Sequence, residues 1–297
     1  MKCDLCPRKC LVDRKKGEKG ICGQTENLKV ARAALHFWEE PCISGDAGSG
    51  AVFFSGCPLH CVFCQNENIA NGTVGKEISL ERLVDIFLEL QEKRANNINL
   101  VTPGHFVPQI VKVLDQARKE GLTLPVVYNT SSYETVDTIK MLEGYVDIYL
   151  PDFKYMSPVL SKKYSHAPDY AEVAKAAIAE MVRQTGKAVF VNGDEDNLIL
   201  SGTIVRHLTL PGCMADSMQI LKYLHDTYGD MIYISIMNQF TPLSNLEKYP
   251  ELNRRITDEE YETLVDYAIE IGIENGFIQE GNTAEESFIP AFDCEGV

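Results

Sequence analysis

Residues 51–64 have the sequence Ala-Val-Phe-Phe-Ser-Gly-Cys-Pro-Leu-His-Cys-Val-Phe-Cys, in which an apolar segment runs directly into a cysteine-rich loop. The segment 51–55 is short and apolar and is followed by Gly56, a pattern that predicts a buried strand. The loop places Cys57, Cys61 and Cys64 within eight residues, so that three thiolates can converge on one metal centre. Three sulfurs leave one position of a tetrahedral zinc or a four-iron cluster open, and an open position is where metal chemistry occurs.

Strand and helix patterns alternate after this loop. After the first strand at 51–55, further strands are predicted at residues 97–102, 125–129 and 146–150. Either 188–192 or 203–210 is the fifth strand, and 231–237 is the sixth. Helices are predicted at residues 79–95, 106–120, 133–143, 170–184 and 216–228, and from Thr257, where Thr257 and Glu260 form a capping box. The alternation predicts an α/β fold, a partial (β/α)6 TIM-like barrel whose functional residues lie at the C-terminal ends of the strands.

The chain has 297 residues and ten cysteines, eight of them in the first 64 residues. We predict a Cys-rich N-terminal extension at 1–50, a metal site within it, a short flexible hinge at 45–50, and a barrel domain at 51–297. Tightly spaced thiols are more often metal ligands than disulfides in a reducing compartment. No apolar stretch reaches the roughly 18 residues that span a bilayer, and the start lacks the apolar core of a signal peptide. We therefore expect a cytoplasmic protein without a membrane partner.

Charge is unevenly distributed along the chain. The formal net charge is −15, which argues against binding to nucleic acid or to an anionic membrane because phosphates would be repelled. Residues 1–30 carry a net charge of +4, whereas residues 247–297 carry −11. We interpret the basic start as a solvated surface. The alternative is that it surrounds a cluster or binds an acidic partner.

A second group of cysteines lies at the start of the chain, at Cys3, Cys6, Cys10 and Cys22. Four sulfurs are enough to close either a structural zinc site or an iron–sulfur cluster, and the spacing does not decide between them. For the loop at 57–64, a structural zinc completed by Cys42 or His105 is the alternative to an open site. The remaining cysteines, Cys42, Cys213 and Cys294, are interpreted as ordinary thiols.

The Cys57-x-x-x-Cys61-x-x-Cys64 loop after the first strand resembles the signature of the radical S-adenosylmethionine (SAM) superfamily. Within it, the chain resembles the pyruvate formate-lyase activating-enzyme branch, and most closely the uncharacterised Fe–S proteins related to that enzyme, from its Cys-rich start to Asn-Gly-Phe-Ile-Gln-Glu-Gly at 275–281. The resemblance implies a [4Fe–4S] cluster on these cysteines, with SAM chelating the fourth iron. Reduction of the cluster would cleave SAM to a 5′-deoxyadenosyl radical, which abstracts a hydrogen from substrate.

The resemblance also implies SAM-binding residues. Phe63 would pack on the adenine, with ordinary core packing as the alternative. Thr102, followed by Pro-Gly and His105, stands where the superfamily usually carries Gly-Gly-Glu; Thr102 and backbone carbonyls would then hold the SAM amino group. The alternative there is a turn with a surface imidazole.

Further strand ends match the activating enzymes with departures. Asn129 and Thr130 stand where those enzymes carry Asp-Thr-Asn-Gly, and Pro-Asp152-Phe-Lys154 resembles their Leu-Asp-Leu-Lys. Lys154 would pair with the SAM carboxylate, and Asp152 and Thr130 would help to hold a monovalent cation, although Asn129 replaces the family Asp. We expect Arg206 to bind the SAM carboxylate or ribose in preference to its neighbour His207, because alternate strand residues face opposite sides. Residues that would form the rim toward the substrate are Met237, Gln239 and Thr241.

The main hypothesis is a radical SAM oxidoreductase that activates a glycyl radical enzyme or a related protein partner, with a flavodoxin-like electron donor. One alternative is a radical SAM enzyme that modifies a small molecule or a peptide. The other is a zinc-stabilised binding protein. The identity of the substrate, the oligomeric state and the reductant do not follow from the sequence.

Overall fold

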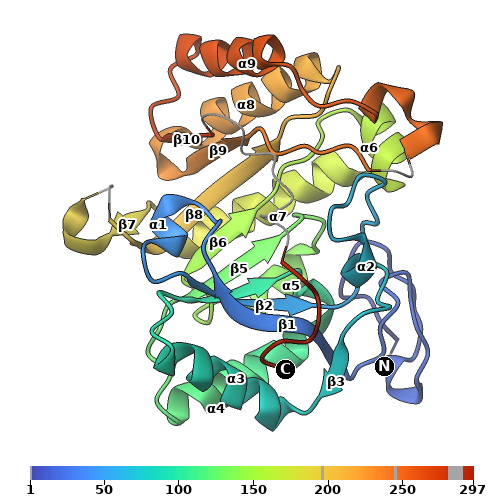
Figure 1. The fold of residues 1–297 in the computed structure, drawn as a ribbon, viewed down its shortest axis with the longest axis vertical. Coiled ribbons are helices and arrows are strands. Elements are labelled where there is room, and N and C mark those ends of the chain that lie inside the picture. Colours follow the sequence, from blue (N-terminus) through green and yellow to red (C-terminus); the bar gives the residue numbers. More distant parts are fainter. Residues whose placement is uncertain (1, 195–196, 244–245, 280–289) are drawn as a thin grey trace.

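A curved sheet of mostly parallel strands forms the centre of the molecule in the computed structural model, which describes residues 2–194, 197–243, 246–279 and 290–297 (Figure 1). The strands are β1 (Leu28–His36), β2 (Ser49–Phe54), β3 (Lys76–Ile78), β4 (Ile98–Val101), β5 (Val126–Thr130), β6 (Ile148–Pro151), β7 (Val189–Phe190), β8 (Ile199–Leu208), β9 (Tyr233–Met237) and β10 (Gly276–Ile278). Their order across the sheet is β10-β9-β8-β6-β5-β4-β2-β1-β3, and β7 pairs only with β8. From β2 to β10 the neighbours in this order are parallel, whereas β1 is antiparallel to both β2 and β3.

Helices follow the strands and pack on the sheet. They are α1 (Pro41–Ser44), α2 (Glu67–Ala70), α3 (Leu80–Glu92), α4 (Val107–Lys119), α5 (Val136–Lys140), α6 (Pro158–Ser165), α7 (Tyr170–Thr185), α8 (Met214–Tyr228) and α9 (Asp258–Glu270). Short 3₁₀ helices lie at Arg14–Lys16, Gly104–Phe106, Val191–Gly193, Gly229–Met231, Leu246–Lys248 and Pro250–Leu252. The pair α3 and α4 covers one end of the molecule, and α8 and α9 lie together at the other (Figure 1).

The predicted α/β partial barrel is confirmed. Of the two segments that competed for the fifth barrel strand, 203–210 is the correct one, because all but its last two residues lie in β8, which pairs in parallel with β6 and β9. The segment 188–192 contains only the two-residue β7, which is antiparallel to β8. The sheet also gains β10 at one edge and the antiparallel β1 and β3 at the other, and the sequence patterns predicted none of these three.

The hinge predicted at 45–50 is wrong for its second half. Ser49 and Gly50 are buried and begin β2, and the Gly50 N–H donates to the Asn97 carbonyl oxygen at 3.0 Å. A side chain at Gly50 would lie 2.7 Å from that same oxygen, so glycine is required here by close packing and not by flexibility. The sheet also crosses the domain boundary predicted at residue 50, since β1 pairs with β2; the division into 1–50 and 51–297 stays a prediction.

Local sequence signals explain where the helices begin. The Ser79 hydroxyl accepts a hydrogen bond from the Arg82 N–H at 3.1 Å and starts α3, as predicted. The capping box of Thr257 and Glu260 is also present at α9. The helix predicted at 133–143 is shorter than expected, because Thr135 caps α5 and the two residues before it are buried.

The core divides into an aliphatic part and an aromatic part. Phe87 of α3 and Ile110 of α4 are fully buried against the sheet, and each such side chain stabilises the fold by about 1.5–3 kcal/mol. Aromatic side chains dominate the second part, around Tyr155 and Tyr170, whose rings meet edge to face at 5.3 Å. This aromatic cluster lies directly behind the cysteine loop and supports it.

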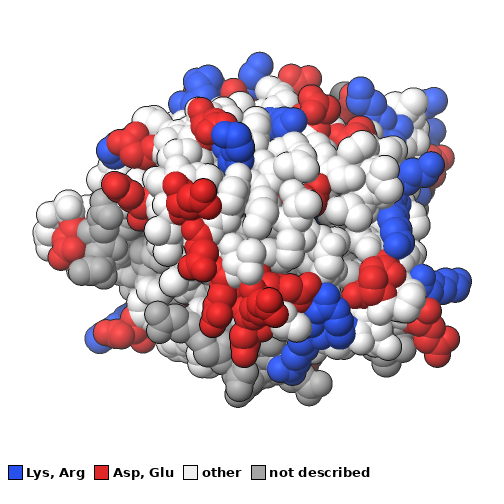
Figure 2. Space-filling model, turned by 90° about the horizontal axis from the view of Figure 1, so that it is seen from above, with Lys and Arg blue, Asp and Glu red and all other residues white. Residues whose placement is uncertain are grey.

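Acidic side chains gather at the end of the molecule that carries α9, as Figure 2 shows from above. The first turn of this helix alone holds Asp258, Glu259 and Glu260, where carboxylates also stabilise the helix dipole. Within the described ranges, none of the helices combines the length and the apolar character needed to cross a bilayer.

Candidate active site

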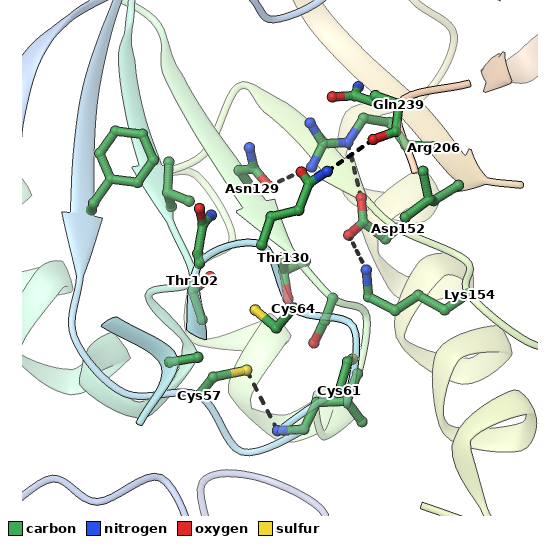
Figure 3. A pocket seen from close by; sticks show the side chains of 18 of the residues that line it. Cys57, Cys61, Cys64, Thr102, Asn129, Thr130, Asp152, Lys154, Arg206 and Gln239 are labelled. Atoms are coloured by element: carbon green, nitrogen blue, oxygen red, sulfur yellow. Dashed lines mark hydrogen bonds and ion pairs between the residues drawn. The ribbon is translucent and has the colours of Figure 1, made fainter. Parts of the chain in front are cut away.

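A cavity of about 250 Å³ opens at the C-terminal ends of the parallel strands, beside the loop with three cysteines (Figure 3). Its lining includes nearly all of the predicted barrel residues: Cys57, Cys61, Phe63, Cys64, Thr102, Asn129, Thr130, Asp152, Lys154, Arg206, Met237 and Gln239. Thr241 does not line it. Residues from five different strand ends and one loop therefore meet in one place, although their roles in binding stay predictions.

The three cysteines of the loop form one donor set. Burial raises the pKa of Cys57 to about 11 and that of Cys64 to about 12, and the charge of Cys61 raises both further. The Ser165 hydroxyl donates to the Cys61 sulfur at 3.1 Å, and the Leu59 N–H donates to the Cys57 sulfur at 3.5 Å. Buried thiols of this kind are neutral at pH 7 unless a cation stabilises the thiolates.

This donor set fits an iron–sulfur cluster. Three thiols from one loop face a cavity with room for a further ligand. In the part of the chain that the structure describes, no three His, Cys, Asp or Glu side chains are grouped closely enough to hold a single metal ion. A [4Fe–4S] cluster does not need such a group, because each cysteine binds a different iron.

Opposite the cysteines, a chain of buried ion pairs crosses the cavity wall (Figure 3). Asp152, just after β6, accepts from Lys154 Nζ at 2.6 Å and from Arg206 Nε at 2.9 Å. The Arg206 guanidinium also donates to the Asn129 amide oxygen at 2.8 Å and to Glu39 at 2.9 Å. The ion-paired side chains are 15% exposed or less, so their charges interact in a low-dielectric environment.

These ion pairs decide the charge states of Asp152, Lys154 and Arg206. Burial alone would raise the pKa of Asp152, but Lys154 and Arg206 together bring that pKa below its ordinary value. Burial likewise disfavours the charged forms of Lys154 and Arg206, yet Asp152 raises the pKa of both. All three groups are therefore charged at neutral pH, and each depends on the others to remain so.

Glu39 is a member of this network that sequence reasoning missed. It follows β1, within the region predicted as an extension, and its second oxygen accepts from the amides of Asn99 at 3.0 Å and Asn129 at 3.2 Å. The signal in the sequence was the acidic pair Glu39-Glu40 between an apolar strand and Pro41. No role was predicted for these two carboxylates, because β1 itself was not predicted.

The neighbouring pair Arg206 and His207 divides as expected, with Arg206 facing the cavity. His207 is buried on the opposite side, where its ring nitrogens contact the Phe153 carbonyl oxygen and the Ser217 hydroxyl, both at 2.8 Å. His207 thus ties β8 to α8 and does not reach the cavity.

The alternative prediction for the region around Thr102 was a turn with the His105 imidazole on the surface. That prediction is wrong, because His105 is 2% exposed and its Nε2 contacts the Ser55 carbonyl oxygen at 2.7 Å. Burial lowers the pKa of His105 to about 3, which keeps the ring neutral. Neither His105 nor Cys42 lines the cavity, and Cys42 is buried beside β5 and β6 in a separate apolar cluster. The arrangement gives no support to a zinc completed by either residue.

Two further predicted residues are held by buried partners. Phe63 lines the cavity and also meets Phe240, Tyr155 and Tyr164 edge to face, at 5.9 to 6.4 Å. The Phe63 ring therefore packs in the core and also faces the cavity, so its position is compatible with both predicted roles. The Thr130 hydroxyl donates to Glu134 at 2.8 Å and accepts from the Ser132 N–H at 3.3 Å, which leaves one lone pair to accept from or bind a further group.

The four N-terminal cysteines lie in tight turns outside the cavity. Cys3 and residues 11–12 exchange backbone hydrogen bonds of 2.9 Å, and the Ile21 N–H donates to the Cys10 sulfur at 3.3 Å. Burial raises the pKa of Cys6 to about 12 and also raises that of Cys22, and neighbouring cysteines of the group add to both shifts. The four thiols are therefore near enough to influence one another.

The two cysteine regions interlock. Arg8, between Cys6 and Cys10, donates to the carbonyl oxygens of Pro58 at 2.9 Å and Ser165 at 2.9 Å. In the reverse direction, His60 Nε2 contacts the Ile21 carbonyl oxygen at 2.8 Å. A side chain at Gly56 would lie 2.4 Å from the Cys22 carbonyl oxygen, so glycine allows the close approach. Each region thus holds the backbone of the other.

Comparison with known proteins places this site. Residues 51–197 match the family model of the Radical SAM superfamily. The predicted resemblance to this superfamily is therefore confirmed for residues 51–197, which make up just under half of the chain. The superfamily implies a [4Fe–4S] cluster and SAM as cofactors. An uncharacterized protein of Methanocaldococcus jannaschii is 27% identical over 275 residues, which cover 90% of this chain and 74% of that protein.

Two solved structures of Streptococcus suis SuiB share the fold. Streptococcus suis SuiB bound to S-adenosylmethionine aligns with a TM-score of 0.52 at 13% identity, over 80% of this chain and 51% of SuiB. SuiB bound to its precursor peptide SuiA aligns with a TM-score of 0.51 at 12% identity, over 76% and 47%. The chain thus spans about half the length of SuiB. A domain of a pyruvate formate-lyase-activating enzyme from Bacteroides vulgatus gives a TM-score of 0.41 at 11% identity, over 59% of this chain and 91% of that domain. The assignment to the pyruvate formate-lyase activating-enzyme branch stays a prediction. Of the sequence motif at 275–281 that supported it, Glu280 and Gly281 lie outside the described residues.

Proposed function

We propose that the protein is a radical SAM oxidoreductase that cleaves SAM reductively at a [4Fe–4S] cluster on Cys57, Cys61 and Cys64. The observation that carries the proposal is the meeting of these three thiols with the charged strand ends in one cavity. When bound, the reduced cluster and SAM supply a 5′-deoxyadenosyl radical that takes a hydrogen atom from substrate.

The residues of the chain would bind and orient SAM. Lys154 lies between Asp152 and the cysteine loop, so its ammonium can turn from Asp152 to the SAM carboxylate. Arg206 is held by three partners and offers its remaining N–H groups to the carboxylate or ribose. Phe63 would pack on the adenine and keep water from that side. Thr102 would hold the amino group through its hydroxyl and through nearby carbonyls.

A monovalent cation fits only with a rearrangement. Both oxygens of Asp152 are already paired, one with Lys154 and one with Arg206. We propose that binding of SAM draws Lys154 away, which frees one Asp152 oxygen for a cation beside the Thr130 hydroxyl. The cation would then replace the charge that Lys154 removes.

The quartet Cys3, Cys6, Cys10 and Cys22 would hold a second metal site, either an iron–sulfur cluster or, once the four sulfurs draw closer together than they lie here, a zinc ion. The support is the donor set of four thiols and the N–H groups directed at their sulfurs, which are typical of metal-binding cysteine turns. Counts of iron, zinc and labile sulfide on protein purified without oxygen would separate the two. A protein with zinc at both sites and no sulfide would instead be a zinc-stabilised binding protein.

The substrate we propose is a protein, either a glycyl radical enzyme or a related partner, with a flavodoxin-like donor of electrons in the cytoplasm. The second candidate is a peptide, which the fold likeness to SuiB bound to a precursor peptide favours by analogy. A small molecule is the remaining alternative. An electron-spin signal that appears on an added glycyl radical enzyme would distinguish the first substrate from the others.

Anaerobic reconstitution tests the reaction itself. We expect the reduced, iron-loaded protein to release 5′-deoxyadenosine from SAM, and Cys57→Ala to release none. Cys213→Ala is the matched control, because Cys213 lies outside the cavity lining and should leave the yield unchanged. A fully loaded and reduced protein that forms no 5′-deoxyadenosine would exclude the proposed reaction.

A further inference from the structure

Residues 290–297 lie along the edge of β1 and continue the pairing that β3 begins (Figure 1, dark red). The strand β3 pairs only with Leu28–Val30. Beyond it, the Cys294 N–H donates to the Ala31 carbonyl oxygen at 3.0 Å, and the Ala33 N–H donates to the Glu295 carbonyl oxygen at 2.8 Å. Since the other edge of β1 is paired with β2, this segment covers the edge that would otherwise be open to another strand.

The edge of β1 presents a basic surface to this acidic segment. Arg32 donates to the Ala291 carbonyl oxygen at 2.9 Å, to Asp293 at 3.1 Å, and to Glu295. Arg82 and Lys76 donate to the carbonyl oxygens of the last two residues, at 3.1 and 3.2 Å. The site therefore recognises carboxylates at two alternate positions, Asp293 and Glu295, together with extended backbone.

An aromatic anchor complements these polar contacts. The Phe292 ring meets Phe53 edge to face at 5.4 Å and packs on the apolar cluster of Ala51, Ile69 and Val101. Pro290, two residues earlier, lines the cysteine cavity and an adjacent cavity of about 170 Å³ along β1. The segment thus leads from the edge of β1 to the wall of the cavity.

We propose that this edge of β1 is a docking site for an extended acidic segment of the protein substrate, and that residues 290–297 occupy it in cis. The inference rests on the proposed function for the chemistry, but docking itself needs neither cluster nor SAM. Addition of a strand to an exposed edge is a common mode of peptide recognition. A substrate segment docked in the same way places the residue two positions before its aromatic anchor at the cysteine cavity, where Pro290 lies.

The geometry also supports release of the segment. Asp293 and Glu295 are 60% and 57% exposed, and the backbone pairing with β1 consists of two hydrogen bonds. Gly296 has a φ of 75°, and a side chain there would lie 2.0 Å from the Ala33 carbonyl oxygen. Gly296→Ala should therefore lift the segment from β1 without changing the sequence of β1, including Arg32. Gly144→Ala is the matched control, because its φ is 78° and nothing lies within 4 Å.

The test uses the full chain and a fluorescent peptide of residues 290–297 that carries Cys294→Ser. We expect no binding at low micromolar peptide by the natural chain or by Gly144→Ala, because the tethered segment competes at a far higher effective concentration. Gly296→Ala should bind the peptide. Added Arg32→Glu, or Phe292→Ala in the peptide, should weaken this binding by at least about tenfold.

Hydrogen exchange at residues 31–33 shows whether the segment has left β1. Faster exchange in Gly296→Ala without peptide binding would overturn the proposal. It would equally be overturned if neither Gly296→Ala nor Phe292→Ala/Gly296→Ala speeds exchange, because the segment would then be a fixed strand. If Gly296→Ala instead forms a dimer in which each copy binds the C-terminal segment of the other, the docking site serves a second copy of the chain. That result would overturn the proposal of a different protein as the partner. None of these outcomes depends on SAM cleavage, so the proposed function can fail or hold separately.

Discussion

The two cysteine regions of this protein have similar sequences but different surroundings. The loop with Cys57, Cys61 and Cys64 lines a cavity and faces the buried charges of Lys154 and Arg206. The N-terminal quartet at residues 3–22 lies in tight turns and contributes nothing to that cavity. One region leaves room for a ligand, and the other holds its neighbour through the Arg8 side chain and its own backbone. The surroundings of a thiol, more than its spacing, therefore indicate whether it serves chemistry or architecture.

The contacts between the regions add a second difference. Arg8 and His60 each bind a carbonyl oxygen of the opposite region. The Leu5 carbonyl oxygen also accepts from the hydroxyls of Thr135 and Thr138, just beyond the cavity residue Thr130. The quartet is thus positioned to order the backbone around the cavity from outside. Changes in the cavity should abolish chemistry, whereas changes in the quartet should act through stability and cluster loading.

The largest expected effect is the contrast between Cys61→Ser and Cys22→Ser. Cys61→Ser removes one of the three proposed cluster ligands, so release of 5′-deoxyadenosine should fall to background while metal at the quartet remains. Cys22→Ser should retain measurable release per loaded cluster but lower the melting temperature and the iron content. Metal analysis and product chromatography on the same samples check both. Equal total loss in both variants would remove the proposed distinction.

The next effect concerns the buried charges. Arg206→Met leaves Asp152 and Glu39 without their shared cation in a buried place, and breaking such pairs costs about 3–5 kcal/mol. We expect a loss of this size in the free energy of unfolding, measured with urea, and weaker SAM binding by calorimetry. Lys222→Met is the control, because its ion pair with Asp226 is exposed and contributes about 1 kcal/mol or less. Similar losses from the two variants would show that the network is not buried in solution.

Glu134 gives a pH-dependent test of the region between the two cysteine groups. It is buried beside Thr130 and Tyr128, and burial raises its pKa to about 7 from an ordinary value of 4.5. The folded state therefore favours the protonated form. Relative to Glu134→Gln, the stability of the natural chain should fall by about 3 kcal/mol as pH rises from 4.5 to 7, and change little outside that window. Urea unfolding across this range measures the difference, and a flat difference would contradict it.

The sequence predicted the repeating part of the fold well. Apolar segments at regular spacing with capping residues such as Ser79 and Thr257 are local signals, and the structure follows them. Strand β1 was missed because it lies in the Cys-rich start, outside the alternation, and gains its place by pairing with β2 and β3. The short β10 likewise depends on pairing with β9.

The site was predictable to the extent that its residues follow strands. Lys154, Asp152 and Arg206 lie at C-terminal strand ends, which meet at one edge of a barrel. Glu39 could not be found in this way, because it reaches the network from the antiparallel β1. The contact between Phe292 and Phe53 joins residues 239 positions apart. Hydrophobic periodicity in a single sequence predicts only local structure, so it could not reveal this contact.

The smallest expected effect sharpens the comparison most directly, because Arg8 belongs to the quartet region and binds the cavity loop. Hydrogen bonds to a charged group contribute about 1.5–3 kcal/mol, and the contacts of Arg8 are partly exposed, so Arg8→Ala should destabilise the fold by about 2 kcal/mol. Lys9→Ala, at an exposed neighbour, is the control and should have little effect. A double-mutant cycle with Cys6→Ser measures the coupling of the quartet to this clamp. If the quartet orders Arg8, the two losses are smaller together than their sum, since Cys6→Ser already loosens the clamp. Additive losses would mean that the two regions merely touch.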